Sequence, residues 1–132
     1  MRKKPYIIKR YLSLRGIKIW EFNQYNTTVQ QWIHTVLENR ETNADVVLEC
    51  CRDIIAYGRE TDDPKLMGFG FFYGGEIYYE LNDGAHFSIM MTEALTYLDR
   101  AEEWELVVRC YNFLGIASMS RGKSDRLRLT II

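Results

Sequence analysis

The segment PKLMGFGFFYGGEIYYEL, residues 64–81, decides the fold that we predict for this chain. Asp63 or Thr61 offers an N-cap and Pro64 suits a first helical turn, so a helix is predicted to begin there. The segment contains Gly68, Gly70, Gly74 and Gly75, and each glycine inside a helix costs about 0.5–1 kcal/mol relative to alanine. Close approach of a neighbouring helix would offset that cost, because an aromatic ring of the neighbour can then lie against the bare backbone. The segment therefore predicts a helix in tight contact with its neighbours.

A second segment repeats the pattern forty residues later. The repeated positions are Phe71, Gly74, Gly75 and Tyr78 in the first segment and Tyr111, Leu114, Gly115 and Ser118 in the second. Apolar residues also align at this offset on two helix-like faces. Acidic pairs recur as well, at 62–63 and 102–103, just before expected helices, where negative charge complements the helix dipole. A repeat of this kind is typical of a stacked binding scaffold and not of an enzyme pocket.

Hydrophobic spacing and turn residues predict an all-α chain. Helices are expected over residues 26–40, 44–60, 64–81, 85–101 and 103–120, and a further one is expected to open near Ser124 after a break at Ser120-Arg121-Gly122. They would pair into hairpins over 26–60, 64–101 and 103–132, the last of them truncated, within one domain spanning 24–132. The predicted fold is thus a stack of antiparallel helical hairpins with a period of about forty residues.

The composition is that of a globular protein with an uneven distribution of charge. Hydrophobic residues make up 47% of the chain, and its net charge is −1. Residues 1–18 carry seven basic residues and no acidic one, whereas residues 19–120 carry an excess of acid. An acidic body favours a basic protein or peptide as its partner over nucleic acid.

The sequence also predicts a cytoplasmic location. No apolar run approaches the roughly 18 residues needed to cross a bilayer, and no secretory signal is recognised. Cys50, Cys51 and Cys110 have no spacing that indicates disulfides or a metal site, so reduced thiols are expected.

Both ends of the chain leave alternatives open. The basic arm over residues 1–23 is predicted to be a poorly ordered tail, but Tyr6, Ile7, Ile8, Tyr11 and Leu12 could instead form an amphipathic helix that contacts a membrane or nucleic acid. Neither a membrane nor nucleic acid is expected as the main partner. At the other end, a truncated hairpin would leave an amphipathic helix uncovered, so either a continuation of the chain or self-association is expected.

The hairpin pattern resembles the tetratricopeptide repeat (TPR). That family has an aromatic residue, then Leu-Gly and Tyr on the first helix, and Ala on the second. These places hold Phe71, Gly74-Gly75, Tyr78 and Ala94 in one repeat, and Tyr111, Leu114-Gly115 and Ser118 in the next. The likeness is close over residues 64–122. Over residues 26–63 it is limited to the spacing of the apolar residues. Phe87 stands where alanine is usual, and the period exceeds the family's roughly 34 residues. The resemblance implies a right-handed stack that packs through these residues and binds protein or peptide.

A looser resemblance is to the N-terminal sensory regions of bacterial diguanylate cyclases, the GGDEF proteins. In those enzymes such hairpins precede a catalytic domain that carries the Gly-Gly-Asp-Glu-Phe signature. The signature does not occur in this sequence, so no cyclase chemistry transfers to any of its residues. The resemblance implies a regulatory or sensory module in bacterial signalling. It leaves open that the chain is a fragment of a cyclase.

The TPR-like register also implies a ligand-binding strip, because first-helix positions form the concave wall of such stacks. The predicted strip consists of Phe72, Glu76, Tyr79 and Glu80, with Arg109 and Asn112 beside them. Tyrosine and glutamate together suit a ligand with apolar and basic groups. Each of the aromatic residues could equally belong to the core.

The sequence gives little support for catalysis or a cofactor. The glycine-rich stretch over residues 68–75 follows no strand and lacks the Gly-Lys-Ser/Thr ending of a nucleotide-binding loop. His34 and His86 have no metal-ligand spacing, so neither a metal nor a cofactor is predicted. A Cys–His catalytic pair stays open, although buried structural cysteines are commoner. The leading hypothesis is a noncatalytic, protein-binding module. The alternatives are a cyclase fragment and an adaptor that acts through the basic arm.

Overall fold

The computed structural model describes residues 22–131, with side chains as far as residue 119, so the expected basic arm lies almost wholly outside the described residues. The helices are α2 (Thr27–Asn39), α3 (Ala44–Glu60), α4 (Pro64–Glu80), α5 (Gly84–Arg100) and α6 (Trp104–Ile131). Over residues 22–131 there is no strand, which confirms the all-α class. None of the helices within this range is long and apolar enough to span a membrane.

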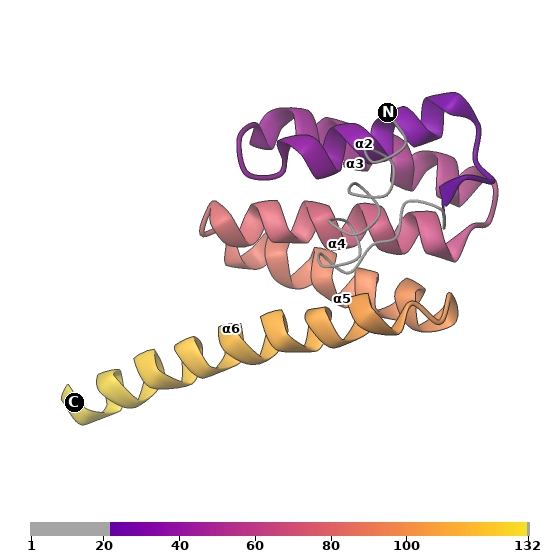
Figure 1. Ribbon diagram of the computed structural model, residues 1–132. Helices are drawn as coiled ribbons and strands as arrows, with labels where there is room; N and C mark the ends of the chain where they lie inside the picture. The colour runs from indigo at the N-terminus through magenta and orange to yellow at the C-terminus, as the bar shows by residue number, and fades with distance from the viewer. Residues whose placement is uncertain (1–21, 132) are drawn as a thin grey trace, which may run out of the picture.

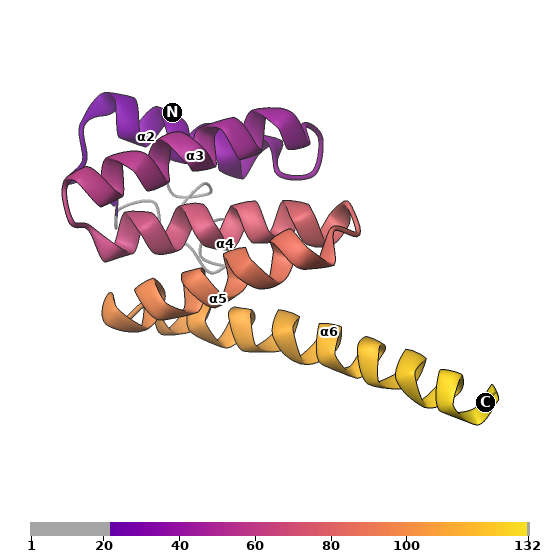
Figure 2. The same ribbon diagram turned by 180° about the vertical axis from the view of Figure 1, so that it is seen from behind.

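Each helix packs against the one that follows it in the chain. Figure 1 shows α2 and α3 at one end of the molecule, α4 and α5 in the middle, and α6 at the other end. The reverse view in Figure 2 shows the same order, and in both views α6 extends well beyond the other helices. The centre of the molecule is therefore α4, which lies between α3 and α5, while α6 contacts its neighbours along only part of its length.

The turns before α4, α5 and α6 share one geometry. Their middle residues take the left-handed conformation, with φ of 51° at Asp62, 59° at Asn82 and 58° at Glu102. The next backbone N–H in each turn donates to a carbonyl five residues back, in the pairs Asp63–Gly58, Asp83–Tyr78 and Glu103–Leu98 (2.8–3.0 Å). These bonds satisfy carbonyl groups that a helix end leaves without partners. One turn type therefore reverses the chain three times, at intervals of twenty residues.

Side-chain caps begin the helices after these turns. The carboxylate of Asp63 accepts a hydrogen bond from the Leu66 N–H at 3.2 Å, with Pro64 in the first turn, which confirms the predicted start of α4. Asp83 caps α5 in the same way through the His86 N–H at 3.1 Å. That backbone hydrogen bond holds the pKa of Asp83 below its ordinary value. Aspartates just before α4 and α5 thus specify where these two helices begin.

The glycines of α4 lie in close contact with both neighbouring helices. A Cβ atom at Gly70 would lie 2.6 Å from Cγ1 of Ile55 and 3.0 Å from the carbonyl oxygen of Cys51, both on α3. A Cβ atom at Gly75 would lie 3.2 Å from Cε of Met91 on α5. The predicted close packing is confirmed, but the side chains that fill the space are aliphatic or thioether groups and not aromatic rings.

The predicted break at residues 120–122 is wrong, because α6 continues without interruption to Ile131. The residue just before α4, α5 and α6 is Asp63, Asp83 and Glu103, respectively. The equivalent position at the predicted break, twenty residues after Glu103, is Lys123. A lysine side chain cannot accept the hydrogen bond that an N-cap requires. A glycine within a helix costs only about 1 kcal/mol, which is not enough to end the helix.

Candidate functional site

The ends of α2 and α4 meet at a buried ion pair. Arg40, which follows the last residue of α2, donates from Nε to Oε1 of Glu76 at 2.8 Å and from Nη2 to Oε2 at 2.5 Å. Both side chains are only 9% exposed. Nη2 of Arg109, on α6, lies 3.6 Å from the same Oε2. A single carboxylate on α4 is therefore held between guanidinium groups from the end of α2 and from α6.

Aromatic rings of α4 support both guanidinium groups. The Cζ atom of Arg40 lies 5.0 Å from the ring centre of Tyr73, and that of Arg109 lies 5.0 Å from the ring centre of Phe72. Burial raises the pKa of Tyr73 to about 12, although the nearby guanidinium groups oppose the shift. A planar bidentate pair stacked on rings holds a fixed geometry. The cluster therefore joins α2, α4 and α6 at one point.

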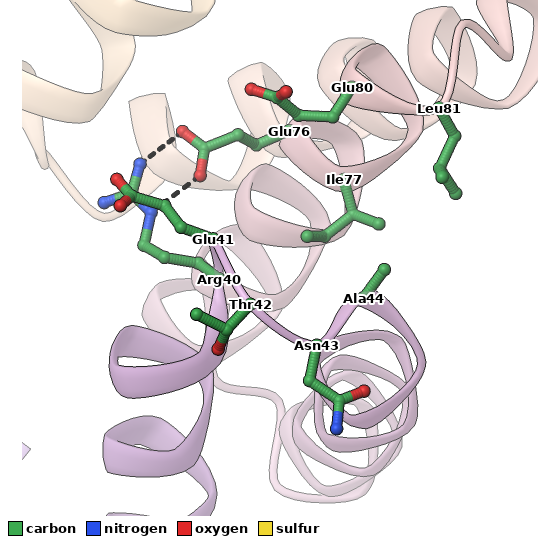
Figure 3. Close-up of a pocket in the computed structure, with 9 residues that line it drawn as sticks. All are labelled: Arg40, Glu41, Thr42, Asn43, Ala44, Glu76, Ile77, Glu80 and Leu81. Atoms are coloured by element: carbon green, nitrogen blue, oxygen red, sulfur yellow. Dashed lines mark hydrogen bonds and ion pairs between the residues drawn. The ribbon is translucent and has the colours of Figure 1, made fainter.

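A cavity of about 330 Å³ opens beside the ion pair, between the turn that joins α2 to α3 and the end of α4. Its lining residues are Arg40, Glu41, Thr42, Asn43, Ala44, Glu76, Ile77, Glu80 and Leu81. Figure 3 shows Ala44 and Ile77 facing each other, while the carboxylates of Glu76 and Glu80 point the same way from α4. Glu76 is already paired with Arg40 and faces Arg109, whereas Glu80 is exposed at the edge of the cavity. The carboxylate of Glu80 beside the apolar lining suits a cation that carries an apolar stem.

The structure brings together only part of the predicted ligand strip. Glu76 and Glu80 both line the cavity, whereas Asn112 is exposed on α6 and does not line it. The exposure predicted for Phe72 and Glu76 is wrong, since Phe72 is fully buried and Glu76 is 7% exposed. The reason is α6, which covers Phe72 with Arg109 and with the ring of Phe113 at 6.1 Å. A role for Tyr79, Glu80, Arg109 and Asn112 in contacting a ligand stays a prediction.

The turn over residues 40–44 was missed by the sequence analysis, although it forms one side of the cavity. Arg40 and Glu76 are 36 residues apart in the chain, and no local pattern predicts that they will meet. The only signal was a basic residue at the end of an expected helix, directly before Glu41.

The predicted repeat-packing residues differ between the two segments. In α4, Phe71 stacks on Tyr97 with ring centres 5.8 Å apart, and Tyr78 stacks on His86 at 4.8 Å. Ala94 of α5 is fully buried, and Gly74 and Gly75 lie against Met90 and Met91. Of the three predicted residues in α6, Tyr111 and Gly115 are exposed and Leu114 packs against the core. The α4 set thus packs against α5, whereas Tyr111 and Gly115 are exposed within the described residues, and a role in packing between repeats stays a prediction.

Other chemically capable residues have structural surroundings. Burial raises the pKa of the Cys50 and Cys51 thiols and raises that of Cys110 to about 12, so the thiol form is favoured over a nucleophilic thiolate. His86 lies at the exposed start of α5, where its Nδ1 is 2.8 Å from Oδ2 of Asp83. Among the described residues no group of three His, Cys, Asp or Glu side chains could hold a metal ion.

Comparison of the chain with protein-family models, with curated proteins and with solved structures found no match. The likeness to tetratricopeptide repeats therefore rests on the residues quoted above, and it enters the following argument as a proposal.

Proposed function

We propose that this chain is a noncatalytic binding module, a TPR-like stack of helical hairpins with a period of about forty residues, and that its ligand is a basic segment of another protein. The observation that carries the proposal is the cavity between the α2–α3 turn and the end of α4. Acidic residues line it on both sides, Glu41 in the turn and Glu76 and Glu80 on α4, and the exposed carboxylate of Glu80 is the one that we propose a ligand contacts first.

The size and lining of the cavity favour one long basic side chain. Its volume of about 330 Å³ is at the lower end of ligand pockets. Ala44, Ile77 and Leu81 supply apolar contact for a hydrocarbon stem, and the carboxylates supply hydrogen-bond acceptors for an ammonium or guanidinium head. A lysine or arginine of an extended peptide combines these two features. The exposed ring of Tyr79 and the carboxylate of Glu80 then continue the contact surface along α4.

The ion pair beside the cavity gives the module a route to regulation. A ligand cation in the cavity competes with Arg40 for the carboxylate of Glu76, which also faces Arg109. Because the three side chains come from α2, α4 and α6, a change in their pairing alters how the helices hold together. A binding event at the α2–α3 turn is thereby passed to α6, as a sensory module in bacterial signalling requires.

The test is an NMR titration with three capped pentapeptides that differ at the central residue, Gly-Ala-Arg-Ala-Gly, Gly-Ala-Lys-Ala-Gly and Gly-Ala-Met-Ala-Gly. The arginine and lysine peptides are expected to shift the amide signals of residues 40–44 and 76–81, and the methionine peptide is expected to leave them in place. Glu80→Gln should weaken binding about threefold, because it removes one exposed carboxylate. Glu93→Gln, an equivalent change at an exposed position of α5, serves as the control.

Two results would contradict the proposed site. One is the absence of shifts in both residue ranges with either basic peptide. The other is an equal response to the methionine peptide, which would show that the carboxylates do not select the ligand.

A further inference from the structure

The segment just before α2 is fixed to the beginning of α4. Phe22 is only 4% exposed, and the centre of its ring lies 5.3 Å from that of Phe69. The ammonium group of Lys65 lies 4.7 Å from the centre of the Phe22 ring. The hydroxyl of Tyr25 donates a hydrogen bond to Oδ2 of Asp63 at 2.7 Å. The chain that precedes α2 is therefore anchored on α4 at Phe22.

One face of α4 leads from this anchor to the cavity. Its residues recur at spacings of three and four, namely Phe69, Tyr73, Glu76 and Glu80. A helix rises 1.5 Å per residue, so the eleven residues from Phe69 to Glu80 correspond to about 16 Å. Phe22 contacts the first end of this face, and the cavity lies at the other end. A chain that leaves Phe22 along α4 thus meets the carboxylate of Glu80.

The sequence before the anchor has the charge that the cavity is proposed to select. Residues 1–18, which lie outside the described part of the chain, carry seven basic residues and no acidic one. Residues 19–120 carry six basic and seventeen acidic residues. The two parts therefore attract each other, most strongly at low salt. The basic arm contains the lysine and arginine side chains that suit the apolar lining and the exposed carboxylate of Glu80.

The length of the connection selects two of the basic residues. An extended chain spans about 3.3 Å per residue, so the backbone of Lys18, four residues before Phe22, reaches at most about 13 Å. Arg15, seven residues before Phe22, reaches at most about 23 Å. The span along α4 lies between these two values. Effective concentration is highest where the length of a linker matches its span, which favours Arg15 and Lys18 over residues 2–10.

We propose that Arg15 and Lys18 bring the basic arm into the cavity of the same chain, where the arm takes the place of a basic segment of another protein. This regulation rests on the function proposed for the cavity. A segment on a short tether has an effective concentration in the millimolar range. A partner must displace it, so its apparent affinity is reduced by the fraction of chains in which the cavity is open. The arm thereby excludes weak ligands and leaves the site to partners that bind tightly or draw the arm away.

NMR of the full 132-residue chain at about 50 mM salt, where charges are little screened, tests the proposal. The double variant Arg15→Gln/Lys18→Gln removes the two charges and leaves the folded body unchanged. Without any ligand, this variant is expected to shift the amide signals of residues 40–44 and 76–81 relative to the parent. The peptide Gly-Ala-Arg-Ala-Gly should then bind the variant at least about threefold more tightly than it binds the parent.

A second double variant, Arg52→Gln/Arg59→Gln, is the control. It changes the net charge by the same amount at two exposed positions of α3. It should leave the amide signals of residues 76–81 in place and bind the peptide like the parent. The shifts between the parent and Arg15→Gln/Lys18→Gln should be the same at about 20 and about 200 µM protein, because binding within one chain does not depend on concentration.

The outcomes separate the role of the arm from that of the cavity. Equal binding of the peptide to the parent and to Arg15→Gln/Lys18→Gln, with shifts at the cavity, retains the binding site and overturns the role of the arm. If the peptide binds neither chain, the function proposed for the cavity fails, and the ligand-free spectra decide the role of the arm by themselves. Identical ligand-free spectra overturn it. Shifts that grow with protein concentration overturn it too, because they show that the arm of a second copy is bound.

Discussion

Helices α4 and α6 carry aligned sequences, yet within residues 22–131 α4 is covered by a neighbouring helix on both sides and α6 on only one. Gly68, Gly70 and Gly74 of α4 align with Val108, Cys110 and Leu114 of α6. In α4 the missing side chains give room to Leu98, Ile55 and Met90 from the flanking helices. The comparison shows that the glycines of α4 make room for side chains of both flanking helices. Of the three aligned residues of α6, only Val108 is exposed, whereas Cys110 is buried and Leu114 packs against the core.

The two helices also differ in charge at aligned positions. Glu76 is buried between two guanidinium groups, whereas Ile116, forty residues later, is half-exposed and carries no charge. A buried carboxylate requires compensating partners, and Arg40 and Arg109 provide them. The position in α4 is thus specialised to hold three helices together, and its counterpart in α6 has no such role.

Introducing a lysine at each of the two aligned positions is expected to give the largest difference in stability. Glu76→Lys should lower the free energy of unfolding by about 4 kcal/mol, because it buries three cations together. Ile116→Lys should change it by less than about 0.5 kcal/mol, since the side chain reaches solvent. Urea unfolding followed by circular dichroism measures both values. Glu80→Lys, one turn beyond Glu76 and exposed, is the control and should behave like Ile116→Lys. A Glu76→Lys variant as stable as that control would contradict the structural role of the ion pair.

Removal of an aromatic ring should distinguish the covered helix from the uncovered one. Phe71→Ala is expected to cost about 2 kcal/mol of unfolding free energy, because the half-buried ring stacks on Tyr97. Tyr111→Ala should cost less than about 0.5 kcal/mol at protein concentrations low enough to keep the chain monomeric. Equal losses of unfolding free energy would mean that the side chain of Tyr111 is already covered within one copy of the chain.

Raising the pH tests whether the face of α6 that packs against α5 is buried. The expected change in stability is smaller than in the preceding tests. Burial raises the pKa of Cys110 to about 12 and also raises that of Cys51 on α3. The unfolded chain therefore releases these thiol protons at a lower pH than the folded chain does. The stabilisation that the buried thiols provide is present below their ordinary pKa, near 8.5, and decreases as the pH rises above it.

The loss should not exceed about 1.4 kcal/mol per pH unit for each thiol. Urea midpoints measured between pH 7.5 and 9.5 are expected to fall, and Cys110→Ala should reduce the slope. Cys50→Ala, at a half-buried site, should reduce it less. If Cys110→Ala left the slope unchanged, the burial of this face of α6 would be in doubt.

The helices could be predicted from the sequence because their signals are local. Periodic apolar residues and the caps Asn43, Asp63 and Asp83 place the ends of α3, α4 and α5 within one or two residues of the observed bounds. The left-handed turn residues were missed, since Asp62 and Glu102 are not glycines. The end of α6 was also missed, because Gly122 does not end the helix.

The site was less predictable because it depends on contacts between distant residues. Glu76 and Glu80 both line the cavity, but whether Glu76 is exposed to solvent depends on Arg40 and on where α6 lies. Phe72 reads as a groove residue by its register, and only the packing of Phe113 shows that it is core. A single sequence does not indicate that α6 will cover the face of α4 that carries Phe72 and Glu76.

The most direct test of this account is the free energy of unfolding of Gly75→Leu and Gly115→Leu, measured by urea denaturation at concentrations where the chain is monomeric. At Gly75 a side chain would meet Met90 and Met91, at 3.3 and 3.2 Å from the first added carbon. A loss of about 3 kcal/mol is expected there. At Gly115 the space is open, and replacing a helical glycine should change stability by no more than about 1 kcal/mol, in the stabilising direction. Similar losses at both positions, or no loss at Gly75, would contradict the claim that α4 is packed on both sides and α6 on one.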